Sequence, residues 1–543
     1  MKVQRIITFL IFFQFITAYH FRCGSDSIKK KPHKIKDIFN SKKRGLSDEY
    51  TPLKLYIDYT YLESQNKLKA RDLIDLKNIF IEVKQTISTL LSILHKKIEL
   101  DGPMITDYCD IPQYAPNIGS ALDIYDILIF PIANPNLDKH VLAQAWTCIT
   151  MASNNRPVAG VVEINPSFTI DKQDTIYYMK FLLLHEFSHV LGFGATFFET
   201  LGFLKTERKN GVIKNYISSP KVIQKAKIHF NCNSIKGVEL ENQGGEGSAG
   251  SHWEARYMLG DYMISTDYPE NVISDITLAY FEDTGFYKVH YYTGGLFRFG
   301  KNRGCAFLEE ECVSNNGQST LFPNEFCTEP KAYFCGSAHL SRGDCYIVEF
   351  KKRIEPKFQH YQNNYKGGFS AADYCPVSYN YDTELEKQYN YPFNCNYGAN
   401  IYTDMGETIG GNSLCFESSL VPKKYNTQLN YTYSVCYKME CDWTNKQIKV
   451  YIFDTTIICP GYETVLNQTN GFNGQIKCPD FNMVCTSVIW CNELFDCINK
   501  KSKANRSTYH SDYIELEEDS DNYINNGLTF YIMIFIIISL LFF

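Results

Sequence analysis

The sequence predicts an α+β N-terminal region followed by a disulfide-rich, loop-rich C-terminal region. Strand-like and helix-like apolar patterns are interspersed from about residue 50, and one helical stretch carries both His185 and His189. From about residue 313 onward, cysteine, tyrosine and asparagine dominate. Interspersed strands and helices are typical of α+β domains, and dense cysteines are typical of disulfide-stapled extracellular domains.

Residues 1–18 have the pattern of a secretory signal peptide. Lys2 and Arg5 precede a run of isoleucine, leucine and phenylalanine that ends at the small residue Ala18. The apolar run is short for a membrane anchor, which is the alternative. The chain is therefore expected to enter an oxidising compartment.

The 19 cysteines agree with that compartment. Cys23 lies apart, and the other eighteen begin at Cys109 and suffice for nine disulfides whose pairing the sequence does not reveal. The sequons at Asn430, Asn467 and Asn505 fit a glycosylated exterior.

Residues 19–45 are basic and lack apolar periodicity, which predicts a flexible propeptide. Lys42-Lys43-Arg44 is a candidate processing site, and a solvated tail is the alternative.

The N-terminal domain is expected over residues 46–194. Residues 53–59 alternate like a strand, residues 70–98 have near-helical apolar spacing, and residues 127–132 and 158–164 read as strands. The strand at 158–164 lies just upstream of the helix that carries His185 and His189.

A central subdomain is expected over residues 195–312, and a cysteine-rich domain with short strands over 313–510. Residues 241–252 are rich in glycine, which predicts a tight loop. Residues 274–285 read as a capped helix that ends at a glycine.

The C-terminal end is expected to anchor the chain to a membrane. Residues 511–527 form an acidic and polar linker, and residues 528–543 are apolar up to the last residue. This pattern is typical of a GPI-anchor signal, and a retained tail anchor is the alternative. The net charge of −6 argues against nucleic acid as a partner.

The stretch His185-Glu186-Phe-Ser-His189 predicts a metal site. Two histidines four residues apart share one helix face, so two imidazoles can reach one ion. Glu186 is then placed to act as a general base without binding the ion, as in zincins. The alternative is a buried helix whose two histidines are hydrogen-bonded in the core.

Catalytic zinc needs three protein ligands and one open position. Gly192 lets the helix stop and the chain turn sharply. His252 is the best candidate for the third ligand, because the glycine-rich loop before it could bring the backbone close to the metal.

The motif His185-Glu186-x-x-His189-x-x-Gly192, with Gly250-Ser-His252-Trp and Met263 far downstream, resembles the leishmanolysin family of metzincin zinc peptidases. The resemblance covers about residues 50–500 and implies a metzincin-type catalytic domain that holds one zinc ion. It implies that Met263 forms an apolar floor beneath the histidines. It also implies that Cys23 is a cysteine switch, since a thiolate would take the open zinc position.

These features together predict a zinc metalloendopeptidase that cleaves extracellular proteins at or near the cell surface. Extended peptide substrates are expected to pair with an exposed edge of the strand at 158–164. The alternative is a cell-surface adhesion protein that keeps the fold, and the C-terminal domain could bind cell-surface ligands in either case. A serine or cysteine protease is disfavoured because no nucleophile motif stands out.

Overall fold

The computed structural model describes Cys23, residues 31–35 and residues 49–485. Within the last range, these positions lie outside the described residues: 97, 99, 139–140, 168–172, 210–211, 244–248, 292–296, 380–393, 396–400, 403–405, 411, 426–428, 430–431 and 468–470. The predicted signal peptide, processing site and apolar tail also lie outside them.

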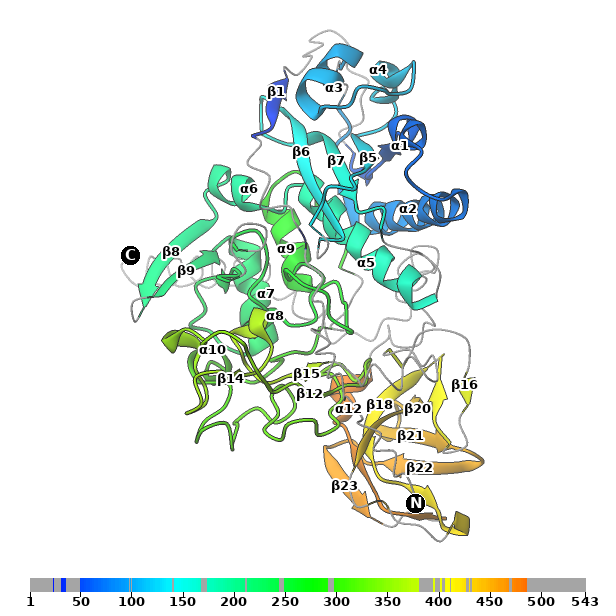
Figure 1. The fold of residues 1–543 in the computed structure, drawn as a ribbon, viewed down its shortest axis with the longest axis vertical. Helices are drawn as coiled ribbons and strands as arrows, with labels where there is room; N and C mark the ends of the chain where they lie inside the picture. The colour runs from blue at the N-terminus through cyan, green and yellow to red at the C-terminus, as the bar shows by residue number, and fades with distance from the viewer. Residues whose placement is uncertain are drawn as a thin grey trace, which may run out of the picture.

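The N-terminal part is built on a five-stranded sheet with the order β1-β6-β7-β5-β3 (Figure 1). The strands are β1 (His33–Ile35), β3 (Leu55–Ile57), β5 (Ile127–Ala133), β6 (Ala143–Met151) and β7 (Pro157–Ile164). β6 runs antiparallel to β7, whereas the pairs β5·β7, β3·β5 and β1·β6 are parallel. The mixture of helices and sheet confirms the predicted α+β class.

The two faces of the sheet are both buried, because apolar residues occupy both alternating positions of its strands. In β5, Ile127 and Ile129 belong to the core that contains α2 (Ala70–Leu90) and α5 (Gln173–Val190). Leu128 and Phe130 belong to the opposite core, against α3 (Gly102–Cys109). The helices α2 and α5 also contact each other, and the ring centroids of Phe80 and Phe187 lie 5.5 Å apart.

Three expectations for this region need correction. The strand at 158–164 is not an edge, since β7 pairs with β5 on one side and β6 on the other. Residues 19–45 are not without regular structure, because β1 pairs with Ile149–Met151 of β6. The helix from residue 70 ends at Leu90, where the chain turns into strand β4 (Leu91–Ile93).

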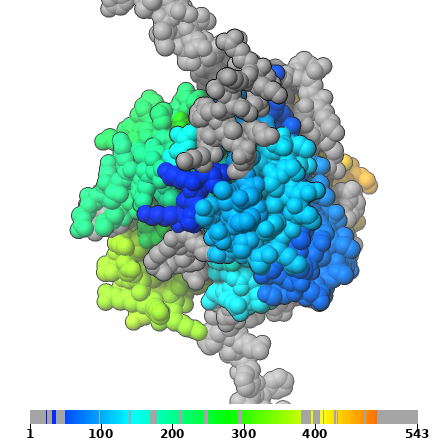
Figure 2. Space-filling view, turned by 90° about the horizontal axis from the view of Figure 1, so that it is seen from above, coloured from blue at the N-terminus to red at the C-terminus, as the bar shows by residue number. Residues whose placement is uncertain are grey.

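The segment of residues 31–35, darkest blue in Figure 2, lies on the molecular surface beside the N-terminal region in lighter blue. His33 and Tyr108 stack with ring centroids 4.1 Å apart, and the carbonyl of Ile35 accepts a hydrogen bond from the amide of Ala152. Contacts on both sides thus hold this segment against the sheet.

The central part contains a three-stranded sheet of β8 (Leu204–Lys209), β9 (Val212–Ile217) and β10 (Val238–Glu239). The helices α7 (Pro220–Phe230) and α9 (Asp275–Asp283) pack against each other beside this sheet (Figure 1). The helix predicted at 274–285 is present as α9, and the side chain of Ser274 caps it by accepting from the amide of Thr277.

The C-terminal part is loop-rich up to about residue 379, but it then forms a six-stranded sheet, β22-β21-β20-β18-β25-β23. Its strands are β18 (Ser413–Ser418), β20 (Tyr433–Asp442), β21 (Gln447–Ile452), β22 (Thr455–Cys459), β23 (Thr464–Asn467) and β25 (Gln475–Cys478). This region is therefore more regular than the sequence suggested.

Eight disulfides are present among the described residues, which confirms the predicted disulfide framework. They are Cys109–Cys148, Cys232–Cys305, Cys312–Cys375, Cys327–Cys345, Cys335–Cys415, Cys395–Cys436, Cys441–Cys485 and Cys459–Cys478. Cys491 and Cys497 lie outside the described residues.

Among the described residues, one helical stretch, Tyr178–Thr200, is long and apolar enough to cross a membrane. However, 78% of its apolar window is buried inside the protein. This stretch contains His185 and His189, and we interpret it as the core helix of a globular domain rather than a membrane span.

Candidate metal centre

Helix α5 ends in a turn that requires glycine. The amide of Gly192 donates to the carbonyl of His189, and the amide of Phe193 donates to the carbonyl of Ser188. These two bonds are those of a Schellman motif, in which the residue after the cap adopts a left-handed conformation. Gly192 has φ of +109°, which side chains with a Cβ atom adopt only with strain. The glycine after the histidine pair therefore ends the helix, as the sequence predicted.

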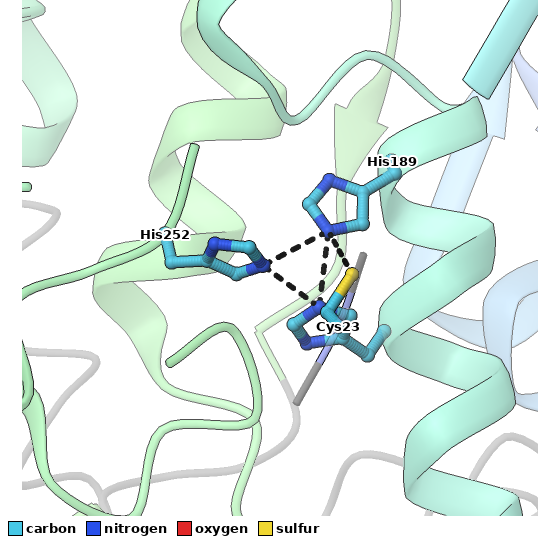
Figure 3. A group of neighbouring side chains, drawn as sticks. Cys23, His189 and His252 are labelled. Atoms are coloured by element: carbon cyan, nitrogen blue, oxygen red, sulfur yellow. Dashed lines mark hydrogen bonds between the residues drawn. The ribbon is translucent and has the colours of Figure 1, made fainter. Parts of the chain in front are cut away.

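The structure brings His185, His189 and His252 together. Figure 3 shows His189 and His252 facing each other. Their Nε2 atoms are 3.0 Å apart for His185–His189, 3.1 Å for His185–His252 and 3.3 Å for His189–His252. Nitrogens about 2.0–2.1 Å from one tetrahedral zinc ion would be about 3.3 Å apart. The three nitrogens therefore fit the ligand set of a catalytic zinc ion.

Two backbone carbonyls fix the orientation of the helix histidines. Nδ1 of His185 donates to the carbonyl of Tyr262 at 2.7 Å, and Nδ1 of His189 donates to the carbonyl of Phe193 at 2.6 Å. A carbonyl only accepts, so each Nδ1 carries the proton and each Nε2 keeps its lone pair for a metal. The turn at Gly192 thus has a second role, because it places the Phe193 carbonyl beside His189.

Burial favours the neutral, metal-binding form of both rings. It lowers the pKa of His185 to about 3 and the pKa of His189 well below its usual value, and the neighbouring imidazoles lower both further. The hydrogen bonds to the two carbonyls oppose this shift without cancelling it. Neutral imidazole is the form that binds zinc.

Backbone pairing carries His252 to the site. The amide of Glu241 donates to the carbonyl of His252, and the amide of Gly250 donates to the carbonyl of Glu241. The two ends of the glycine-rich segment, Glu241 and Gly250, are therefore hydrogen-bonded to each other, next to His252. His252 is completely buried.

Met263 is completely buried, and its backbone is fixed beside the third histidine. The carbonyl of Met263 accepts from the amide of Trp253, and its own amide donates to Oδ1 of Asp261 at 2.7 Å. Oδ2 of Asp261 accepts from Thr277, whose hydroxyl also accepts from the Trp253 indole. Asp261 therefore joins the Met263 turn, the His252 segment and α9, a role that the sequence analysis missed.

Replacing Asp261 with alanine is expected to destabilise the fold by about 1–3 kcal/mol, because it leaves the buried amide of Met263 without an acceptor. Burial raises the pKa of Asp261 to about 6, so the folded state favours the protonated carboxyl. The stabilisation from protonation is fully present below about pH 4 and is lost as the pH rises through about 6. The difference in unfolding free energy between wild type and variant should therefore shrink over that range.

Denaturant unfolding of the two proteins between pH 4 and 7 measures this difference. Asp107, which is exposed on α3, provides the control, and Asp107→Ala should change stability by less than about 0.5 kcal/mol. Equal stability of Asp261→Ala and wild type would contradict the role given to Asp261.

Cys23 lies at the same cluster, far from the histidines in sequence. Its Sγ atom is 3.5 Å from Nε2 of His189, and the thiol is buried (Figure 3). The four donor atoms of Cys23, His185, His189 and His252 all lie within 4.8 Å of one another. Three nitrogens and one sulfur match the four-coordinate set of a closed zinc site.

Glu186 follows His185 in α5 and is completely buried. Its carboxylate does not belong to the group of donor atoms that lie within 4.8 Å of one another. The carboxylate is therefore close to the site in sequence but separate from the ligand set, as a general base requires.

The chain is similar in sequence to known proteins over most of its length. The family model described as Leishmanolysin matches residues 81–491. A leishmanolysin homolog of Crithidia fasciculata is 28% identical over 446 residues, which cover 79% of this chain and 66% of that protein. Leishmanolysin of Leishmania major is 28% identical over 398 residues, which cover 70% of this chain and 63% of that protein.

A leishmanolysin-like peptidase of Caenorhabditis elegans is 26% identical over 463 residues, covering 70% of this chain and 69% of that protein. The chain spans slightly less than two thirds of the length of the Crithidia and Leishmania proteins. Because the family model covers well over half of the sequence, and because the three histidines meet as zinc ligands would, the chain belongs to the leishmanolysin family of zinc metallopeptidases.

Proposed function

We propose that this chain is a zinc-dependent metalloendopeptidase that cleaves extracellular proteins at or near the cell surface. The observation that carries the proposal is the convergence of three buried Nε2 atoms 3.0–3.3 Å apart. We propose that the catalytic part has the metzincin arrangement, with Met263 beneath the histidines. The eight disulfides fit an extracellular location, and a membrane anchor at the C-terminal end is part of the proposal.

The chemistry assigns one task to each group of residues. His185, His189 and His252 would hold the zinc ion, which when bound lowers the pKa of a water molecule and polarises the scissile carbonyl. Glu186 takes a proton from the attacking water and passes it to the leaving amine. Its complete burial keeps this carboxylate away from bulk water, which strengthens its electrostatic interactions.

An extended substrate would pair with β6 rather than with β7. Thr147 of β6 donates a hydrogen bond to the carbonyl of Val190 at the end of α5, so β6 lies directly beside the histidine helix. The outer edge of β6 at Ile149–Met151 now carries β1, which belongs to the proposed propeptide. Because β1 pairs with only this end of β6, removal of the propeptide would lengthen the edge that can bind a peptide through main-chain hydrogen bonds.

Removing the metal tests the proposal. We expect 1,10-phenanthroline to abolish casein cleavage by the mature protein, because the histidines alone cannot activate water. Addition of zinc after removal of the chelator should restore cleavage. Inhibitors of serine and cysteine proteases provide the control and should leave the rate unchanged.

The same assay separates the enzyme from an adhesion protein with this fold. A protein that binds zinc but cleaves neither casein nor gelatin would favour adhesion and contradict the proposed activity. Cleavage that persists in the chelated protein would contradict the zinc mechanism.

A further inference from the structure

Four consecutive carbonyl groups where α5 ends, those of residues 190–193, accept hydrogen bonds from side chains. Three of the donors are hydroxyls, and the fourth is the ring of a proposed zinc ligand. The pairs are Thr147 with Val190 at 2.8 Å, Tyr287 with Leu191 at 3.0 Å, Tyr280 with Gly192 at 2.6 Å, and His189 with Phe193 at 2.6 Å. Carbonyls at the end of a helix lack partners within the helix, so these side chains fix the turn that follows His189.

Tyr280 of α9 holds the middle of this turn. Its side chain is completely buried, and its hydroxyl donates to the carbonyl of Gly192. Its ring centroid lies 5.0 Å from that of Phe193. Tyr280 therefore contacts both the backbone and a side chain of the turn. The next carbonyl, that of Phe193, is the one that orients the ring of His189.

Thr277 of α9 holds the segment that carries the third histidine. It lies three residues before Tyr280, on the same face of the helix. Its hydroxyl accepts a hydrogen bond from the indole of Trp253 at 2.7 Å, and both side chains are completely buried. Trp253 directly follows His252. One face of α9 therefore binds the His252 segment through Thr277 and the turn after His189 through Tyr280.

We propose that Thr277 and Tyr280 are positioning residues for the zinc ligands. Together they clamp two segments to α9, so that His189 and His252, 63 positions apart in the chain, keep their Nε2 atoms 3.3 Å apart. Neither residue contacts the ion or the substrate in this role. The inference rests on the proposed zinc site and adds the helix that sets its geometry. Partners that orient metal ligands commonly contribute 10–100-fold to metal affinity.

A purely structural role for the two hydroxyls has a different consequence. A hydroxyl that only satisfies a buried polar group stabilises the fold equally with and without metal. Its loss would lower the stability of the zinc-free protein and leave the affinity for zinc unchanged. A clamp, in contrast, lowers the affinity for zinc when it is removed, because the ligands are then less well placed before the ion binds.

Competition with a chromophoric chelator measures the zinc dissociation constants of the mature wild-type, Tyr280→Phe and Thr277→Val proteins. Each substitution removes one hydroxyl and keeps the approximate shape of the side chain. We expect each to raise the zinc dissociation constant about tenfold or more. Thr277→Ser keeps the hydroxyl and should bind zinc as wild type does. Because both residues act through one helix, the double variant should show less than the product of the two single effects.

Tyr437→Phe provides the matched control. Tyr437 is a buried tyrosine of β20 whose hydroxyl donates to that of Ser418, and its loss should leave zinc affinity unchanged. Denaturant unfolding of the zinc-free proteins shows which variants fold, and Tyr280→Phe alone suffices if Thr277→Val does not. Wild-type zinc affinity in folded Tyr280→Phe would overturn the clamp and leave the proposed peptidase standing. Absence of zinc binding by wild type would overturn both.

Discussion

Replacement of Glu186 with glutamine is expected to lower peptide hydrolysis roughly 10²–10⁴-fold, the usual contribution of a general base. Glutamine keeps the size and shape of the side chain but cannot accept the proton of the attacking water. Zinc should remain bound, because the Glu186 carboxylate is not among the clustered donor atoms. The measurement is the rate of casein or peptide cleavage, together with the zinc content of the same preparation.

Glu199, which is exposed on α6 (Ala195–Thr200), provides the matched control. Glu199→Gln makes the same chemical change near the end of the histidine helix and should leave the rate unchanged. Near-normal cleavage by a zinc-loaded Glu186→Gln protein would remove Glu186 from the mechanism.

Replacement of Cys23 with alanine is expected to make the unprocessed chain active. The Cys23 thiol lies 3.5 Å from Nε2 of His189, in the place of a fourth ligand. If the thiol closes the site in about 99% of molecules, its removal should raise the activity of the precursor about 100-fold. The measurement compares peptide hydrolysis by unprocessed wild-type and Cys23→Ala chains, whose length is checked by mass spectrometry.

Lys34→Ala is the control for this experiment, because Lys34 is an exposed residue of the same proposed propeptide, residues 19–45. This variant should stay as latent as wild type. A Cys23→Ala precursor that is equally latent would show that Cys23 does not silence the site, and latency would then have to come from β1 on the edge of β6.

The local parts of the site could be predicted from the sequence. The spacing of His185 and His189 fixes their common helix face, and Gly192 marks the end of that helix, because both depend on a few neighbouring residues. His252 could be proposed only through the glycine-rich loop and the family resemblance, because it lies 63 positions after His189. The carbonyls of Tyr262 and Phe193 could not be predicted, because any residue type supplies a carbonyl.

The order of strands in the sheet was the main error. The strand at 158–164 was expected to offer a free edge, but its residues are apolar on both faces and it lies between β5 and β6. Apolar runs of this kind are typical of interior strands. The pairing of β1 with β6 could not be predicted either, because three residues in a basic segment carry no periodic signal.

In the cysteine-rich region, the sequence predicted that disulfides form but not which cysteines pair. The count of cysteines predicted a disulfide framework, and eight bridges are present among the described residues. The pairing could not be read from sequence spacing: Cys415 and Cys436 are register partners in β18 and β20, yet they form disulfides with Cys335 and Cys395. In the six-stranded sheet, β20·β21 and β21·β22 are local hairpins, whereas β18 pairs with β20 and with the more distant β25, which no short window of sequence contains.

The most direct test of the zinc site is the zinc content of mature wild-type and His252→Ala proteins, from which the segment with Cys23 has been removed, measured by mass spectrometry of the metal. Three ligands that converge from two distant segments predict one zinc per wild-type chain and loss of most of that zinc in the variant. Full zinc occupancy in a folded His252→Ala protein, or wild type without zinc after purification in its presence, would contradict the site.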